Sequence, residues 1–148
     1  MAADLKGHAW AVLLTAHATL VERVEAALAA AGLPALAWYD ALWELEKAGG
    51  RLRMRELAQR VVLSKSNLSR LADRLEGAGL VERADAADDG RGYDLVLTRA
   101  GRAMRRRMWP VYATQIETHF SRHVTLEEAR VLGEALGRAV KAARSAPA

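Results

Sequence analysis

The sequence of 148 residues contains no cysteine, which excludes thiol catalysis, zinc sites built on cysteine, and disulfide bonds. It has no run of about 18 apolar residues that could cross a membrane. The first ten residues also lack the basic-then-apolar pattern of a secretory signal. We therefore expect a soluble, cytoplasmic protein, long enough to bury a core without a metal or a disulfide.

Catalytic and cofactor-binding motifs are missing as well. The sequence has no phosphate-binding glycine loop, no nucleophile elbow and no HExxH motif. Ser64 and Ser66 have no evident histidine base near them in the chain. We therefore expect neither an enzyme nor a bound cofactor.

The net charge of +4 is distributed unevenly along the chain. Residues 51–109 contain 14 Lys and Arg against 8 Asp and Glu, a net of +6, and the rest contains 8 against 10, a net of −2. Such a basic stretch is either a solvated arginine-rich surface or a face that meets a polyanion. The shape of the elements that carry the arginines decides between these two interpretations.

Apolar spacing predicts long helices on both sides of the basic stretch. The first covers residues 5–31 and ends at Gly32 and Pro34, and a second covers residues 35–48. Near the end of the basic stretch, Thr98 is expected to cap a helix that runs to about residue 121 and kinks at Pro110. A capping box opened by Thr125 begins the last helix, which runs to about residue 144.

Between these helices the pattern is shorter and then changes period. Two short helices are expected over residues 54–61 and, with Ser64 as the N-cap, up to residue 76. Residues 80–83 and 93–97 are β-prone and flank a polar loop, which predicts a hairpin. The fold class is therefore mainly α with a small β-hairpin wing, arranged as a winged helix-turn-helix.

The second short helix has outward side chains that suit a DNA major groove, which is only about 12 Å wide. Serine and asparagine bond phosphates or base edges, and arginine can fork onto guanine. A solvated helix face would show the same residues, but arginines at the start of the preceding helix favour DNA, because helix N-termini bind phosphate. The predicted DNA contacts are Arg53, Arg55, Ser64, Lys65, Ser66, Asn67, Ser69, Arg70, Arg74 and Arg91.

Arg91 lies near the tip of the predicted hairpin, beside Asp89 and Gly90. An arginine on a narrow protruding loop is shaped to enter a minor groove, whose potential attracts it. Asp89 could brace its guanidinium. Taken alone, the loop would also fit an ordinary hairpin tip.

These segments resemble the MarR family of bacterial regulators over nearly the whole chain. The resemblance rests on residues 52–58, residues 71–83, and the wing pattern Asp89-x-Arg91-x-x-x-Leu95-x-Leu97-Thr98-x-x-Gly101. It implies one domain over residues 1–148, with dimerisation helices at 1–33 and 99–148 and a DNA-binding lobe at 35–98.

The resemblance also implies a function. A homodimer would place two recognition helices and two wings on a palindromic operator of double-stranded DNA, with half-sites about one helical turn apart. Many such regulators are repressors that a small aromatic or anionic effector releases from DNA. The alternative is a winged-helix protein without ligand sensing that acts architecturally or through protein partners.

One subgroup of the family responds to urate and related purines. The positions that match its ligand-binding residues are Trp10, Asp40, Arg70 and Arg83. Asp40 would equally fit a carboxylate braced by a structural arginine. The four tryptophans, Trp10, Trp38, Trp43 and Trp109, favour ordinary packing over an effector pocket.

His119 and His123 are spaced i, i+4 and could share a metal with a third ligand such as His8 or His17. No constellation of carboxylates or cysteines is obvious around them in the sequence. A structural histidine pair is therefore favoured, and no metal site is expected.

Overall fold

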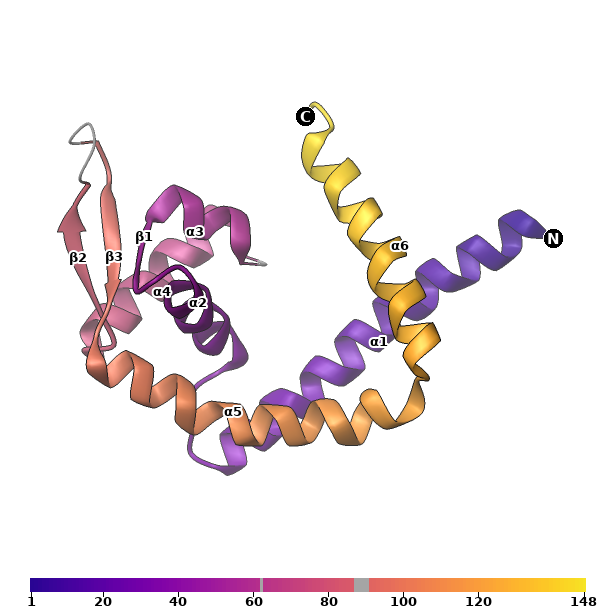
Figure 1. Ribbon diagram of the computed structural model, residues 1–148, viewed down its shortest axis with the longest axis horizontal. Helices are drawn as coiled ribbons and strands as arrows, with labels where there is room; N and C mark the ends of the chain where they lie inside the picture. Colours follow the sequence, from indigo (N-terminus) through magenta and orange to yellow (C-terminus); the bar gives the residue numbers. More distant parts are fainter. Residues whose placement is uncertain (62, 87–90) are drawn as a thin grey trace.

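The computed structural model describes residues 1–61, 63–86 and 91–148, and within them the elements follow the predicted order (Figure 1). The helices and strands are α1 (Ala2–Ala30), α2 (Leu36–Lys47), β1 (Arg51–Arg53), α3 (Met54–Arg60), α4 (Lys65–Gly77), β2 (Val81–Asp85), β3 (Tyr93–Leu97), α5 (Arg99–His119), the 3₁₀ turn η1 (Ser121–His123) and α6 (Leu126–Ser145). The fold class is thus confirmed as a mainly helical winged helix-turn-helix.

The wing is a three-stranded antiparallel sheet in the order β1-β3-β2. Arg51 pairs with Val96 on one side of β3, and Val81 pairs with Leu97 on the other. The sequence did not indicate β1, because three residues are too short to show an alternating pattern. Its pairing matters for function, since it ties the start of α3 to the wing.

The core of the winged helix-turn-helix lobe, residues 35–98, lies where α2, α3 and α4 pack against this sheet. The apolar stripe of α4 faces inward through Leu68, Leu71 and Leu75, as the spacing of three and four predicts. Leu57 from α3 and Leu95 from β3 are fully buried among them. The lobe is therefore closed by residues of a single chain.

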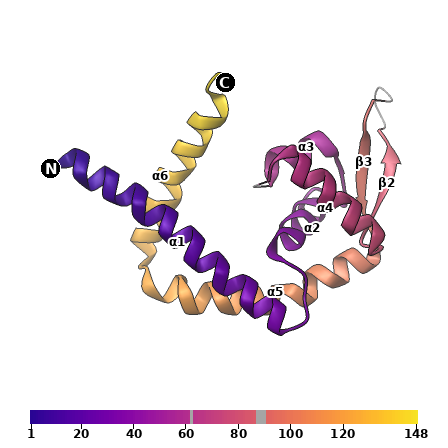
Figure 2. The same cartoon turned by 180° about the vertical axis from the view of Figure 1, so that it is seen from behind.

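A second apolar cluster joins the lobe to the long helices. It contains Val24 and Leu28 of α1, Tyr39 of α2 and Met108 of α5. Figure 2 shows α1 running alongside α5 at this point. The Glu25 carboxylate also accepts a hydrogen bond of 3.0 Å from the backbone N–H of Leu36, at the start of α2.

The start of α5 approaches the wing very closely at Gly101. The Thr98 hydroxyl caps α5 by accepting a 3.0 Å hydrogen bond from the Gly101 N–H, and it donates a 2.7 Å bond to the Gly79 carbonyl. A Cβ atom on Gly101 would lie 2.2 Å from the carbonyl oxygen of Leu80, closer than atoms can pack. Only glycine fits at this position of the wing pattern.

The last helix lacks the buried face that the other long helices have. Along α6 no residue is buried, and Val131, Leu132, Leu136 and Val140 are between 39% and 49% exposed. In Figure 1 α6 turns away from the end of α5. The N-terminal half of α1 is similar, with Trp10 at 62% exposure. Among the described residues, no helix is long and apolar enough to cross a membrane.

Candidate nucleic-acid interface

Helix α4 presents a polar face to solvent opposite its buried leucines. Its N-cap is Ser64, whose hydroxyl accepts a 3.3 Å hydrogen bond from the Asn67 N–H, as the sequence predicts. The cap leaves the first turn of α4 protruding into solvent. The exposed residues of α4 include Ser66, Asn67, Ser69, Arg70 and Arg74.

Two of the predicted contacts, Arg55 on α3 and Arg53 on β1, differ in their exposure to solvent. Arg55 lies exposed in the first turn of α3. Arg53 is only 9% exposed, and its guanidinium donates a hydrogen bond to the backbone carbonyl of Arg91. This burial does not fit the predicted phosphate contact, so Arg53 supports the wing from beneath.

A second arginine of β1 also bonds to the wing. The Arg51 Nε donates a 2.6 Å hydrogen bond to the carboxylate of Asp94, and an Nη donates a 3.0 Å bond to the Asp85 carbonyl. Asp94 is buried, whereas the Arg51 side chain is 47% exposed, so the pair lies at the edge of the lobe with its carboxylate inside. Sequence reasoning missed it because its partners are 43 residues apart.

Arg91 is exposed at the described end of the hairpin. Asp89, its predicted brace, and the side chain of Lys65 lie outside the described residues. Among the predicted contacts in the described part of the chain, the exposed face of α4, Arg55 and Arg91 are thus solvent-accessible.

Arg83 has a different environment from the other arginines. Its guanidinium forms ion pairs with Asp73 and Glu76 of α4 and lies 4.9 Å from the centre of the Tyr93 ring. The hydrogen bond to Asp73 raises the pKa of Arg83 above its usual value. This charge is compensated within the lobe.

A model of the MarR family matches residues 31–92. AbsC, a MarR family transcriptional regulator from Streptomyces coelicolor, is 31% identical, with a TM-score of 0.86 over 97% of each chain. The chain belongs to the MarR family. Its relatives are transcriptional regulators, a class that in general has no catalytic activity.

Two further MarR structures are similar along most of the chain. Sco3205 from Streptomyces coelicolor, solved in complex with DNA, is 27% identical, with a TM-score of 0.85 over 94% of this chain and 88% of that one. A MarR regulator from Silicibacter pomeroyi is 28% identical, with a TM-score of 0.76 over 97% of this chain and 95% of that one. Among curated protein sequences, no match is found.

The MarR chain has a pocket of about 440 Å³ where α2 meets α5, which we call the junction pocket. Burial, reinforced by the nearby carboxylates of Glu44 and Glu25, raises the pKa of Asp40 to about 6. Tyr39 and Trp109 stack with their ring centres 5.9 Å apart. The residues that line it are Tyr39, Asp40, Trp43, Arg105, Trp109, Tyr112 and Ile116.

The four residues matched to the purine-responsive subgroup are not gathered in this pocket within one chain. Asp40 lines it, but Trp10 lies near the far end of α1 and Arg83 pairs with α4. Arg70 lies on the exposed face of α4. Of the pocket's other residues, Arg105, Trp109 and Tyr112 come from α5, and of these three the sequence had singled out only Trp109, for which it favoured ordinary packing.

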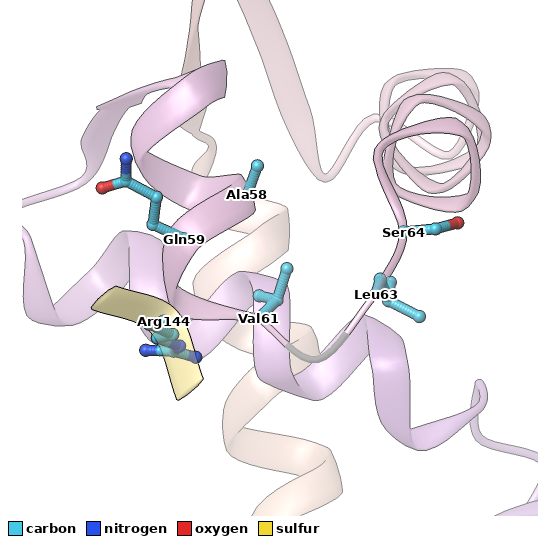
Figure 3. A pocket seen from close by; sticks show the side chains of 6 residues that line it. All are labelled: Ala58, Gln59, Val61, Leu63, Ser64 and Arg144. Carbon is cyan, nitrogen blue, oxygen red and sulfur yellow. The ribbon is translucent and has the colours of Figure 1, made fainter. Parts of the chain in front are cut away.

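A larger cavity of about 820 Å³ lies between the α3–α4 turn and the end of α6 (Figure 3). Its polar side chains are Gln59, Ser64 and Arg144. Figure 3 shows that the Ser64 hydroxyl and the Gln59 amide point away from each other. Because a ligand site needs polar groups that converge, this cavity is the weaker candidate of the two.

The histidines are engaged by neighbouring oxygens. His119 Nε2 lies 3.1 Å from the Gln115 side-chain oxygen, and His123 Nε2 lies 3.1 Å from the Thr118 carbonyl. Each ring therefore has a hydrogen-bonding role within its own segment.

Proposed function

We propose that this MarR-family protein is a homodimeric repressor that binds a palindromic operator and is released from it by a small aromatic effector. The observation that carries the proposal is that the polar face of α4 and Arg91 of the wing are both exposed. Side chains that bond base edges lie on a helix that protrudes, and an arginine lies on a hairpin shaped for a minor groove. The DNA contacts that we propose are Arg55, Ser64, Lys65, Ser66, Asn67, Ser69, Arg70, Arg74 and Arg91.

The apolar faces of α1 and α6 support the dimer. An isolated helix with its leucines in water has little to stabilise it, and adjacent exposed apolar residues mark contact surfaces. Homodimers are typical of this family, and a second copy of the chain would cover both helices. In this arrangement residues 1–33 and 99–148 would form the dimer, and residues 35–98 would bind DNA.

The junction pocket supports effector release. It lies between α2, which belongs to the lobe, and α5, which leads to the proposed dimer helices. A ligand that filled it would favour one angle between lobe and dimer, and that angle sets the distance between the two recognition helices.

The proposal is tested by selecting binding sites from a random DNA library and measuring the selected site by gel shift. A palindrome with half-sites about one turn apart is expected. Non-selective binding would instead favour the architectural alternative.

Arginine variants test the DNA contacts. We expect Arg91→Ala to weaken operator binding and to lower the salt slope by about one unit, because one phosphate is no longer neutralised. Arg70→Ala should in addition relax the sequence preference. The control is Arg23→Ala, which removes an exposed arginine of α1. If both lobe variants bind like the control, the docking of α4 and the wing on DNA is wrong.

A further inference from the structure

The junction pocket contains a carboxylate, that of Asp40, which is unpaired among the described residues although arginines lie nearby. Within the described part of the chain, the Asp40 carboxylate has no hydrogen-bond or ion-pair partner. It is half-buried, and two further carboxylates, Glu44 and Glu25, lie close enough to raise its pKa. A carboxylate kept in such a place is costly unless something pairs with it.

The positive groups around the pocket are already engaged. Arg105 forms an ion pair with Glu46, and its guanidinium lies 4.9 Å from the centre of the Trp43 ring. Lys47 forms a 2.8 Å ion pair with Glu44 and lies 5.6 Å from the centre of the same ring. Glu46 also pairs with Arg102 at 3.7 Å, and among the described residues that line the pocket Asp40 is the carboxylate without an ion pair.

Aromatic rings form the rest of the wall. Tyr112 meets Tyr39 edge to face, with ring centres 5.1 Å apart, and meets Trp109 at 5.9 Å. Trp109 is 43% exposed, so part of its ring is open to a ligand. Aromatic faces attract cations and stack on planar groups, and a site of about 300–1,000 Å³ accepts a small molecule.

We propose that the junction pocket binds a small aromatic amine as its protonated cation, with the ammonium group on Asp40 and the aromatic group against Trp109 and Tyr112. The inference deepens the proposed function, on which it rests, by naming the chemical class of the effector. An aromatic acid of the same size would bring its own negative charge against an unpaired carboxylate. The pocket should therefore select the amine over the acid.

Binding should also depend on pH, because the cation competes with a proton for Asp40. The titratable and charged groups around Asp40 are Glu25 of α1, Tyr39, Glu44 and Lys47 of α2, and Arg105 and Tyr112 of α5. In the folded protein without ligand the pKa of Asp40 is about 6, so roughly a tenth of the Asp40 carboxyl groups are ionised at pH 5. The amine should then bind about tenfold more weakly at pH 5 than at pH 7.5.

The test uses two ligands that share an indole ring and differ in charge, tryptamine and indole-3-propionate, titrated calorimetrically into the full-length protein at pH 7.5. Tryptamine is expected to bind at least about tenfold more tightly than the acid. Asp40→Asn should weaken tryptamine binding by about 10- to 100-fold. Glu22→Gln, which removes an exposed carboxylate of α1, should not change it.

Three results would overturn the inference. One is tighter or equal binding of indole-3-propionate, another is unchanged tryptamine binding by Asp40→Asn, and the third is tighter binding of urate than of tryptamine. Asp40→Asn breaks no hydrogen bond or ion pair among the described residues, and unfolding curves verify that each variant is folded.

A gel shift on the selected operator separates this inference from the proposed function. Tryptamine should release the wild-type protein from the operator, and Asp40→Asn should need a higher concentration. If the protein binds its operator but no tryptamine, the effector class is wrong and the DNA-binding proposal stands. If tryptamine binds but no DNA sequence is selected, the amine site stands and the proposed repressor function fails.

Discussion

The winged helix-turn-helix lobe buries its apolar residues, whereas helix α6 exposes them. Leu57 and Leu75 of the lobe are completely buried, whereas Leu132 and Leu136 of α6 are 40% and 39% exposed. The lobe obtains its stability from packing within one chain. Helix α6 has no such packing, so its stability depends on a second surface. Burial within one chain thus distinguishes the lobe that we propose binds DNA from the helix that we propose forms the dimer.

The largest effect is expected when charge is placed on the exposed apolar face of α6, which tests whether this face is buried in a dimer. The double variant Leu132→Glu, Leu136→Glu is expected to convert the dimer to monomers, because two carboxylates per chain would have to be buried without partners. Operator affinity should fall by about 100- to 10,000-fold, since both half-sites are no longer held together. Sedimentation velocity and gel shift measure the two effects.

Its control is the double variant Arg138→Gln, Lys141→Gln. These residues lie on the opposite side of α6, and the change alters the net charge by the same amount. A dimer that survives the glutamates, or that dissociates in the control as well, would refute the assignment of this face.

Within the lobe, the largest decrease in stability is expected from Gly101→Ala. A Cβ atom there would lie 2.2 Å from the Leu80 carbonyl oxygen, and a backbone atom cannot move away as a side chain can. We expect the free energy of unfolding, measured with urea, to fall by about 3 kcal/mol or more.

The matched control is Gly77→Ala, near the end of α4, where an added Cβ meets no atom within 4 Å. It should be neutral or stabilising by up to about 1 kcal/mol, through helix propensity. Equal decreases in the two variants would contradict the close approach of α5 to the wing.

Asp40 lies at the joint between the two regions, and its removal should increase stability. Its pKa is raised from 3.8 to about 6 in the folded protein. The folded state therefore binds more protons than the unfolded state between these values, and the protein loses stability as the pH rises from about 4 to 6. At about 1.36 kcal/mol per pKa unit, Asp40→Asn should gain about 1–3 kcal/mol at pH 7.5.

The pH dependence provides the check. At pH 3.5, below both pKa values, Asp40 is mostly protonated in the folded and the unfolded state, so most of the gain should disappear there. Urea unfolding at pH 7.5 and pH 3.5 measures both. A gain that persists at the lower pH would assign it to packing and not to charge.

The smallest expected effect is that of the cap where the lobe meets α5. Thr98→Ala removes the hydroxyl that accepts from Gly101 and donates to Gly79, at a cost of about 1 kcal/mol. Thr114→Ala, whose hydroxyl bonds only the Pro110 carbonyl one turn earlier, should cost almost nothing. Thermal melts compare the two, and a reversed order would show that this cap does not hold the wing to α5.

The sequence was most informative where local physics determines structure. The caps at Ser64, Thr98 and Thr125 were predicted from single residues and are all present. Helix ends were predicted to within a few residues for the same reason. Strand β1 was missed because its three residues depend on β3 for their pairing.

The site was less predictable than the fold. Arg53 has the sequence position of a phosphate contact, yet it is buried under Arg91, because β1 turns its side chain toward the hairpin. The junction pocket depends on Trp109 and Tyr112 meeting α2, a helix far earlier in the chain, and no local pattern reports such a meeting. Asp40 was named from the sequence through its match to the purine-responsive subgroup, but the aromatic residues of α5 beside it were not part of that match.

Helix α5 links these observations mechanically. Its first turn presses against Leu80 of the wing, and Trp109, eight residues after Gly101, lines the junction pocket. Eight residues of helix span about 12 Å. A tilt of α5 by only about 5° at the pocket would thus move its wing end by about 1 Å. A displacement of this size is enough to break a hydrogen bond between an arginine of the wing and DNA. In this MarR protein helix α5 both supports the wing and lines the junction pocket. The effector that we propose could therefore move the wing through α5.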